Sequence, residues 1–244
     1  MTGRFVSVVG LYGRKHGPVR DFLAGLQALI AEHTGNSFRP YSLDQVHATL
    51  IALDGVRDPE TGMIDNFYYL QHAGARREMD FQQVIDIVTR RFADPLRVRI
   101  GGVARQQEVP FTSSGRHPFE RAFSVQGQAF VLIGWPVVSL SGPARPLDEL
   151  RRDMNAANVL HKYHVRATDV DNDLYLVLGH HAGAPADVLE RATAAVRGKL
   201  AVDPIELDIG LADIKVVAAD SHTLAPPLYV SDIPADEVIL RALM

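Results

Sequence analysis

A histidine and a threonine two residues apart, His47 and Thr49, are the side chains of this sequence best suited to chemistry. They lie in residues 45–55, a β-branched and aliphatic run that ends in an Asp-Gly turn and predicts a strand. Because side chains alternate along a strand, the two share one face, about 6 to 7 Å apart. An imidazole that transfers a proton and a hydroxyl that donates a hydrogen bond could together bind two oxygens of one anion.

The composition sets the class of protein. The chain has 244 residues, is 47% hydrophobic, carries a net charge of −4 and has no cysteine. This length suffices for one large domain or two small lobes, and no apolar run is long enough to predict a membrane span. The lack of cysteine excludes disulfides and thiol nucleophiles, and together with the lack of a secretory signal pattern it fits a cytoplasmic protein. The mild acidity argues against extended duplex DNA binding, although a local basic pocket for one phosphate is compatible with it.

Two rounds of strand, helix and strand are predicted to carry these residues. The first has a strand at 5–12, an amphipathic helix from Pro18 to about residue 32, and the strand with His47. The second has a strand at 128–138, a helix from 147 to about 161, and a strand at 173–179. The other expected elements are a long polar excursion at 54–80, a helix at 81–92, a strand at 96–103, a loop at 105–123, a helix at 185–200, and strands at 205–211, 214–219 and 228–233.

This repeat predicts an α+β fold made of two lobes, residues 1–123 and 124–244, within one domain that spans 1–244. Antiparallel sheets would face a central cleft, with helices outside and with strands that could be exchanged between the lobes.

With its Val46-His47-Ala48-Thr49-Leu50 strand in a repeated strand-helix-strand unit, the chain resembles the 2H phosphoesterase superfamily. That superfamily includes the bacterial RNA 2',3'-cyclic phosphodiesterases called 2'-5' RNA ligases. The resemblance implies a pseudo-symmetric hydrolase that needs no metal or cofactor, with one His-x-Thr/Ser motif in each lobe. One histidine would act as general base and the other as general acid on a cyclic phosphate. It implies that His47 is the acid or base, that Thr49 orients the phosphate, and that the ligand is a nucleotide or an RNA terminus.

The second motif departs from this pattern. By the parallel of the strands, Asp173-Leu174-Tyr175-Leu176 stands where the second His-x-Thr-Leu is expected, so Asp173 replaces the histidine and Tyr175 the threonine. An ionised Asp173 could serve as a base but would repel a phosphate, whereas the Tyr175 hydroxyl can still donate to an anion. A slipped alignment would instead offer His164, His180 or His181.

Three interpretations follow from this departure. The chain is an enzyme in which another group replaces the second histidine, a protein that binds a nucleotide or RNA end without turnover, or a protein of this fold in which His47 is structural and the function lies elsewhere. Neither the substrate's base nor the oligomeric state can be predicted from these residues.

Other polar residues complete the set of candidates. Tyr12 ends the first predicted strand, and Arg116 and His117 lie on a glycine-containing loop, so these three are candidates for contact with a substrate. His161 and His164 are expected at a helix end, where they would favour the helix dipole. Residues 13–17, with Lys15 at their centre, lack the spacing of a P-loop and are interpreted as a solvated turn. No metal site is expected, because the adjacent His180 and His181 would point to opposite faces of a strand.

Overall fold

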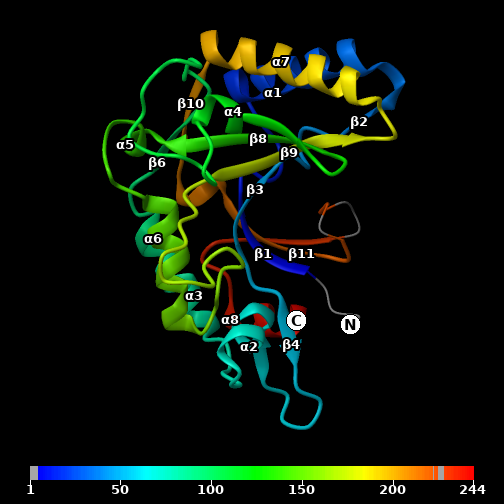
Figure 1. Ribbon diagram of the computed structural model, residues 1–244. Helices are drawn as coiled ribbons and strands as arrows, with labels where there is room; N and C mark the ends of the chain where they lie inside the picture. The colour runs from blue at the N-terminus through cyan, green and yellow to red at the C-terminus, as the bar shows by residue number, and fades with distance from the viewer. Residues whose placement is uncertain (1–4, 222, 225–227) are drawn as a thin grey trace.

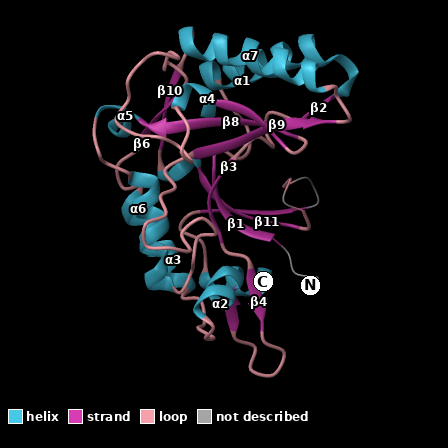
Figure 2. Ribbon diagram, in the orientation of Figure 1, coloured by secondary structure: helices cyan, strands magenta, loops and turns pink. Residues whose placement is uncertain are grey.

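A computed structural model of the chain describes residues 5–221, 223–224 and 228–244. Over these residues the protein is a mixed α+β structure in which helices cover a large antiparallel sheet (Figures 1 and 2). The strands follow the order β10 (Ile205–Ile209), β6 (Leu96–Ile100), β8 (Ala129–Pro136), β9 (Leu174–His181), β3 (Ala48–Ala52), β1 (Phe5–Gly10), β11 (Ile214–Ala219) and β12 (Leu228–Asp232). The short strands β2 (Phe38–Pro40) and β7 (Phe123–Gln126) pair with β9 and β8.

The junction between β3 and β9 lies in the middle of this sheet. There Ala48 of β3 pairs with Leu176 of β9 in antiparallel register. The strands β10, β6, β8 and β9 lie on one side of the junction, and β3, β1, β11 and β12 on the other. The predicted α+β class with antiparallel strands is confirmed, while the pseudo-symmetric arrangement of two facing sheets stays a prediction.

Two long helices pack side by side over the half of the sheet that contains β8 and β9 (Figure 1). They are α1 (Gly17–Thr34) and α7 (Ala186–Val202), both close to their predicted bounds. In α1 a proline occupies the first turn, and the buried residues Leu23, Leu26 and Ile30 recur at the three- and four-residue steps of one helix face. None of the helices in the described part of the chain is long and apolar enough to cross a membrane.

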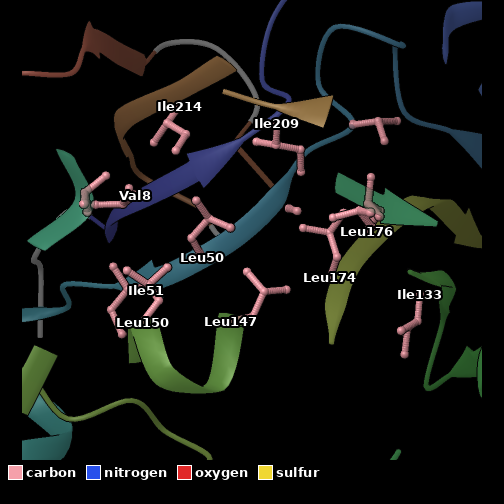
Figure 3. Packing of buried hydrophobic residues seen from close by; sticks show 14 of the residues in the cluster. Val8, Leu50, Ile51, Ile133, Leu147, Leu150, Leu174, Leu176, Ile209 and Ile214 are labelled. Carbon is pink, nitrogen blue, oxygen red and sulfur yellow. The ribbon is translucent and has the colours of Figure 1, made fainter. Parts of the chain in front are cut away.

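The other half of the sheet is covered by α3 (Phe81–Arg91) and α6 (Pro146–Asp153), which contact each other. Figure 3 shows Leu147 and Leu150 pointing from α6 toward Leu50 and Ile51 of β3. All four side chains are at most 1% exposed. The strand that follows His47 and contains Thr49 is therefore held on its other face by a packed apolar layer.

Short elements fill the segments that the sequence predicts as loops. Residues 54–80 form a hairpin of β4 (Gly55–Arg57) and β5 (Ile64–Asn66), followed by α2 (Phe67–Ala73). Asn66 caps α2, because its side chain accepts a hydrogen bond from the Tyr69 N–H at 2.9 Å. The remaining helices of the described chain are α4 (Pro118–Arg121), α5 (Val137–Ser141) and α8 (Glu237–Leu243).

The helix expected over 147–161 is shorter than predicted. Helix α6 ends at Asp153, and one 3-10 turn follows at Met154–Ala157. Asn158 then adopts the left-handed conformation, with φ of 57°, which ends the helical path. His161 consequently lies in a loop and not at a helix end, and this loop returns to the sheet at β9.

Candidate functional site

A cavity of about 410 Å³ lies next to the junction of β3 and β9. Four of its lining side chains come from the residues on either side of the Ala48–Leu176 pair, namely His47, Thr49, Tyr175 and Val177. Alternation along the two strands puts these four on one face, while Ala48 and Leu176 are fully buried on the other. The predicted residues His47, Thr49 and Tyr175 are thus brought together.

His47 immediately precedes β3 and is 9% exposed. Its Nδ1 lies 2.7 Å from the main-chain oxygen of Gln45, and since a carbonyl only accepts, Nδ1 carries the proton. Burial lowers the pKa of His47, the Gln45 bond partly opposes this, and the charge of Lys15 lowers the pKa further. At neutral pH the imidazole is uncharged, and Nε2 is left as a lone-pair acceptor able to act as a base.

Tyrosines make up much of the remaining wall. Four of the seven tyrosines in the sequence line the cavity: Tyr41, Tyr68, Tyr163 and Tyr175. Burial, followed by a smaller effect of Tyr163, raises the pKa of Tyr175, and its hydroxyl donates to Gln126 Oε1 at 3.2 Å. Burial, with Tyr175 second, raises the pKa of Tyr41 to about 12. With raised pKa values, Tyr41 and Tyr175 stay protonated at neutral pH and are hydrogen-bond donors.

A second histidine, His161, also lines this cavity. Its Nε2 donates to Asp171 Oδ2 at 2.8 Å, so Nδ1 is the unprotonated nitrogen. Burial lowers the pKa of His161 to about 4, more than the bond to Asp171 raises it. Nδ1 is buried and has no hydrogen-bond partner among the described residues. The expected role at a helix end is corrected here, because the loop that follows α6 carries His161 to the cavity.

Arg151 of α6 fixes that loop against β3. Its side chain is 2% exposed and pairs with Asp171 Oδ1 at 3.2 Å. The same guanidinium donates to the main-chain oxygens of Leu50 at 3.1 Å, Asp171 at 2.9 Å and Asp173 at 3.0 Å. Burial by itself would raise the pKa of Asp171, but Arg151 and the His161 bond outweigh it and lower the pKa to about 2. The guanidinium is thus engaged in holding the fold.

The charges along the cavity wall balance. Besides the pair of Arg151 and Asp171, the charged lining residues are Lys162 and Asp54, which makes two cations and two anions. With both histidines neutral the formal charge of the lining is zero. Lys162 and Tyr163 are exposed, and the Lys162 Nζ lies 4.7 Å from the centre of the Tyr163 ring. Such a cavity suits a ligand of low charge that carries an aromatic ring.

Asp173, predicted beside His47, lies elsewhere. Its carboxylate accepts hydrogen bonds from Trp135 Nε1 at 2.7 Å, Ser113 Oγ at 2.6 Å and Arg121 at 3.0 Å. It lines a second cavity, of about 440 Å³, together with Trp135 and Ser113. These three donors hold the Asp173 side chain at the second cavity, on the other side of the residues that precede β9. The structure does not bring Asp173 to the His47 cavity.

Arg116 and His117 also lie away from His47. Arg116 is exposed, and its main chain pairs with that of Ser113. His117 caps α4 by accepting from the Phe119 N–H at 3.2 Å and donates to the Gln107 oxygen at 2.8 Å. Neither residue lines the His47 cavity.

The third predicted contact residue, Tyr12, does lie beside His47. The two rings meet edge to face with centroids 6.1 Å apart, and the Tyr12 hydroxyl donates to the Leu224 oxygen at 3.4 Å. Tyr12 therefore flanks the histidine of the site.

The histidines that a slipped alignment would offer have other partners. His164 is buried against Asp148, with 2.8 Å between its Nε2 and Oδ1. His180 packs against Tyr41 with ring centroids 5.2 Å apart, and His181 Nε2 donates to the Gly127 oxygen at 3.1 Å. These three do not line the His47 cavity. Within the described residues, no group of three or more His, Cys, Asp or Glu side chains is arranged to hold a metal ion.

The chain was compared with protein families, curated proteins and solved structures. No family model matches the chain, and no curated protein matches it. Among solved structures, the chain is similar to the crystal structure of TT0787 of Thermus thermophilus. The TM-score is 0.42 at 15% sequence identity, and the match covers 94% of each chain.

Proposed function

We propose that this chain is a 2H-type phosphoesterase that hydrolyses a cyclic phosphate or phosphodiester of RNA or of a nucleotide without a metal ion. His47 acts as the acid or base, and Thr49 orients the phosphate. The observation that carries the proposal is the joint position of His47, Thr49 and Tyr175 at one cavity, on two strands that pair at Ala48 and Leu176.

The register at this pair supports a two-fold relation between the halves of the site. Two antiparallel strands are related locally by a two-fold axis, so residues that precede the paired residues correspond to each other. His47 then corresponds to Tyr175, and Thr49 to Val177. The second motif is Tyr175-Leu176-Val177-Leu178, two residues later than the alignment that puts Asp173 at its start. In this pseudo-symmetric arrangement a phenol takes the place of the second imidazole.

The chemistry that fits these groups is an in-line displacement at phosphorus. His47 Nε2 removes a proton from the attacking water as the new P–O bond forms. Thr49 donates a hydrogen bond to a phosphate oxygen, which carries the developing charge, and the single proton of the Tyr175 hydroxyl turns from Gln126 to the ribose oxygen bonded to phosphorus. As the bond from phosphorus to the ribose oxygen breaks, the protonated Tyr175 supplies the proton to that oxygen and regains one from the histidine through solvent. Each proton that is taken up is thereby returned.

A binding protein without turnover is the second candidate. The observations that favour it are the absence of a hydroxyl at Val177 and the raised pKa of Tyr175, which makes the phenol a weaker acid than an imidazolium. Such a protein would keep the cavity and its donors but would lack an efficient group for protonating the leaving oxygen.

One experiment separates these candidates. Purified protein is mixed with nucleoside 2',3'-cyclic monophosphates and with a short RNA that ends in a cyclic phosphate. Binding is followed by calorimetry, and product is followed by chromatography. Product formation supports the enzyme, heat of binding without product supports the second candidate, and neither signal contradicts both. His72→Ala, at an exposed position of α2, is the matched control for His47→Ala.

A further inference from the structure

Lys15 is buried immediately behind His47. The sequence predicts a solvated turn for residues 13–17, but Lys15 is 7% exposed in the segment between β1 and α1. Its ammonium group donates to three main-chain oxygens, those of Gly13 at 3.0 Å, Asp44 at 3.3 Å and Val46 at 2.5 Å. An ammonium group has three donors, so this carbonyl cage uses all of them. The expectation of a solvated turn is corrected for Lys15.

The cage and the His47 hydrogen bond use consecutive peptide groups. The oxygens of Asp44 and Val46 accept from Lys15, whereas the oxygen of Gln45, between them, accepts from His47 Nδ1. Holding the two outer carbonyls toward Lys15 fixes the orientation of the middle one. Lys15 therefore controls the acceptor that sets the tautomer of His47.

Lys15 also contributes charge at this position. Burial lowers the pKa of Lys15 to about 8, the charge of Asp44 opposes the decrease, and the side chain is mostly protonated at pH 7. A buried cation disfavours a second cation nearby. The other titratable groups that line the cavity with His47 are the four tyrosines defined above, His161, the paired Arg151 and Asp171, and Lys162 with Asp54. These acidic and basic groups balance, so the charge on the far side of His47 comes from Lys15, which the nearby Asp44 carboxylate partly offsets.

We propose that Lys15 is a positioning residue for His47. Lys15 orients the Gln45 carbonyl so that the proton of the imidazole stays on Nδ1, and its charge keeps the imidazole uncharged and able to act as a base. The assignment of His47 as a base rests on the proposed function, whereas the effect of Lys15 on the imidazole does not. A histidine held neutral remains a base to lower pH, so Lys15 widens the pH range in which the site can take a proton.

The test is an NMR titration of the His47 ring in the wild type, Lys15→Gln and Lys15→Arg. A glutamine amide still donates to the carbonyls but has no charge, and arginine keeps the charge. We expect the His47 midpoint to shift to higher pH in Lys15→Gln and to stay near the wild-type value in Lys15→Arg. If turnover is found, the acidic limb of kcat/KM should shift in the same direction. Lys199→Gln, in an exposed ion pair of α7, is the matched control and should leave the midpoint unchanged.

A folded Lys15→Gln protein with an unchanged His47 midpoint would overturn the proposal. If that variant does not fold, the NMR titration of the wild type tests the proposal by itself. The His47 signals should move a second time as Lys15 loses its proton near pH 8. Constant His47 signals throughout the Lys15 titration would overturn it as well. The absence of turnover with every substrate would contradict the proposed function but leave the NMR result for Lys15 unaffected.

Discussion

Ala48 of β3 pairs with Leu176 of β9, and the residues that precede them, His47 and Tyr175, line one cavity. This register makes an imidazole and a phenol the equivalent groups of the two strands. Burial lowers the pKa of the imidazole, which leaves it uncharged, and raises the pKa of the phenol, which keeps its proton. In the proposed reaction the imidazole is therefore the proton acceptor and the phenol the proton donor.

Loss of the Tyr175 hydroxyl should weaken ligand binding. In Tyr175→Phe the ring remains to fill the space, while one hydrogen bond to the phosphate is lost, which corresponds to roughly a ten-fold rise in Kd. Calorimetry with a nucleoside 2',3'-cyclic monophosphate measures the change. Tyr229→Phe on β12, outside the cavity lining, should bind as the wild type does. Equal affinities of the two variants would mean that the Tyr175 hydroxyl does not contact the ligand.

Activity should depend on the hydroxyl of Thr49 more than on the shape of its side chain. Thr49→Val keeps the volume but loses the donor, so kcat/KM for a cyclic phosphate should fall about ten-fold or more. Thr49→Ser keeps the donor and should retain most of the activity. Steady-state kinetics on both variants provide the comparison, and a serine variant as impaired as the valine variant would contradict the assigned role.

Removal of Arg151 should destabilise the whole fold. Arg151→Met removes the cationic partner of the Asp171 carboxylate and the donor to several main-chain oxygens, which should lower the free energy of unfolding by about 3 to 5 kcal/mol. Denaturant unfolding followed by circular dichroism gives this quantity. Arg90→Met, at a side chain that is 63% exposed, should change it by less than about 0.5 kcal/mol. A small effect at Arg151 would mean that the loop is held by other contacts.

Stability should decline in mild acid. The pKa of His161 is about 4 in the folded chain, below its usual 6.5, so the unfolded chain binds more protons between these values. Neutral His161 contributes on the order of 3 kcal/mol to the free energy of unfolding. This contribution is complete above pH 6.5 and is lost as the pH falls toward 4. Denaturant unfolding at several pH values should show a shallower dependence for His161→Gln than for His72→Gln, and equal slopes would contradict the shift.

The sequence predicts the helices and strands that have a regular apolar period. The steps of Leu23, Leu26 and Ile30 predict α1, and the aliphatic run after His47 predicts β3, because local periodicity determines which face is buried. Sequence reasoning also predicts His47, Thr49 and Tyr175 as site residues from their types and strand positions, and in the structure the three line one cavity.

Long-range contacts determine what sequence reasoning misses. Lys15 is buried because carbonyls about thirty positions later surround it, and no local pattern near residue 15 indicates this. His161 reaches the cavity because Asn158 ends the helical path early and Arg151 ties the returning loop to β3. Asp173 is held away from the His47 cavity by Ser113, Arg121 and Trp135, which are 38 to 60 positions earlier in the chain.

The central claim is that His47 performs metal-independent hydrolysis of a phosphodiester or cyclic phosphate. Its most direct test is the hydrolysis of a nucleoside 2',3'-cyclic monophosphate in the presence of excess chelator, followed by phosphorus NMR for the wild type, His47→Ala and His72→Ala. We predict that the wild type and His72→Ala open the cyclic phosphate and that His47→Ala is at least about a hundred-fold slower. Hydrolysis by His47→Ala at the wild-type rate, or hydrolysis abolished by the chelator, would contradict the claim.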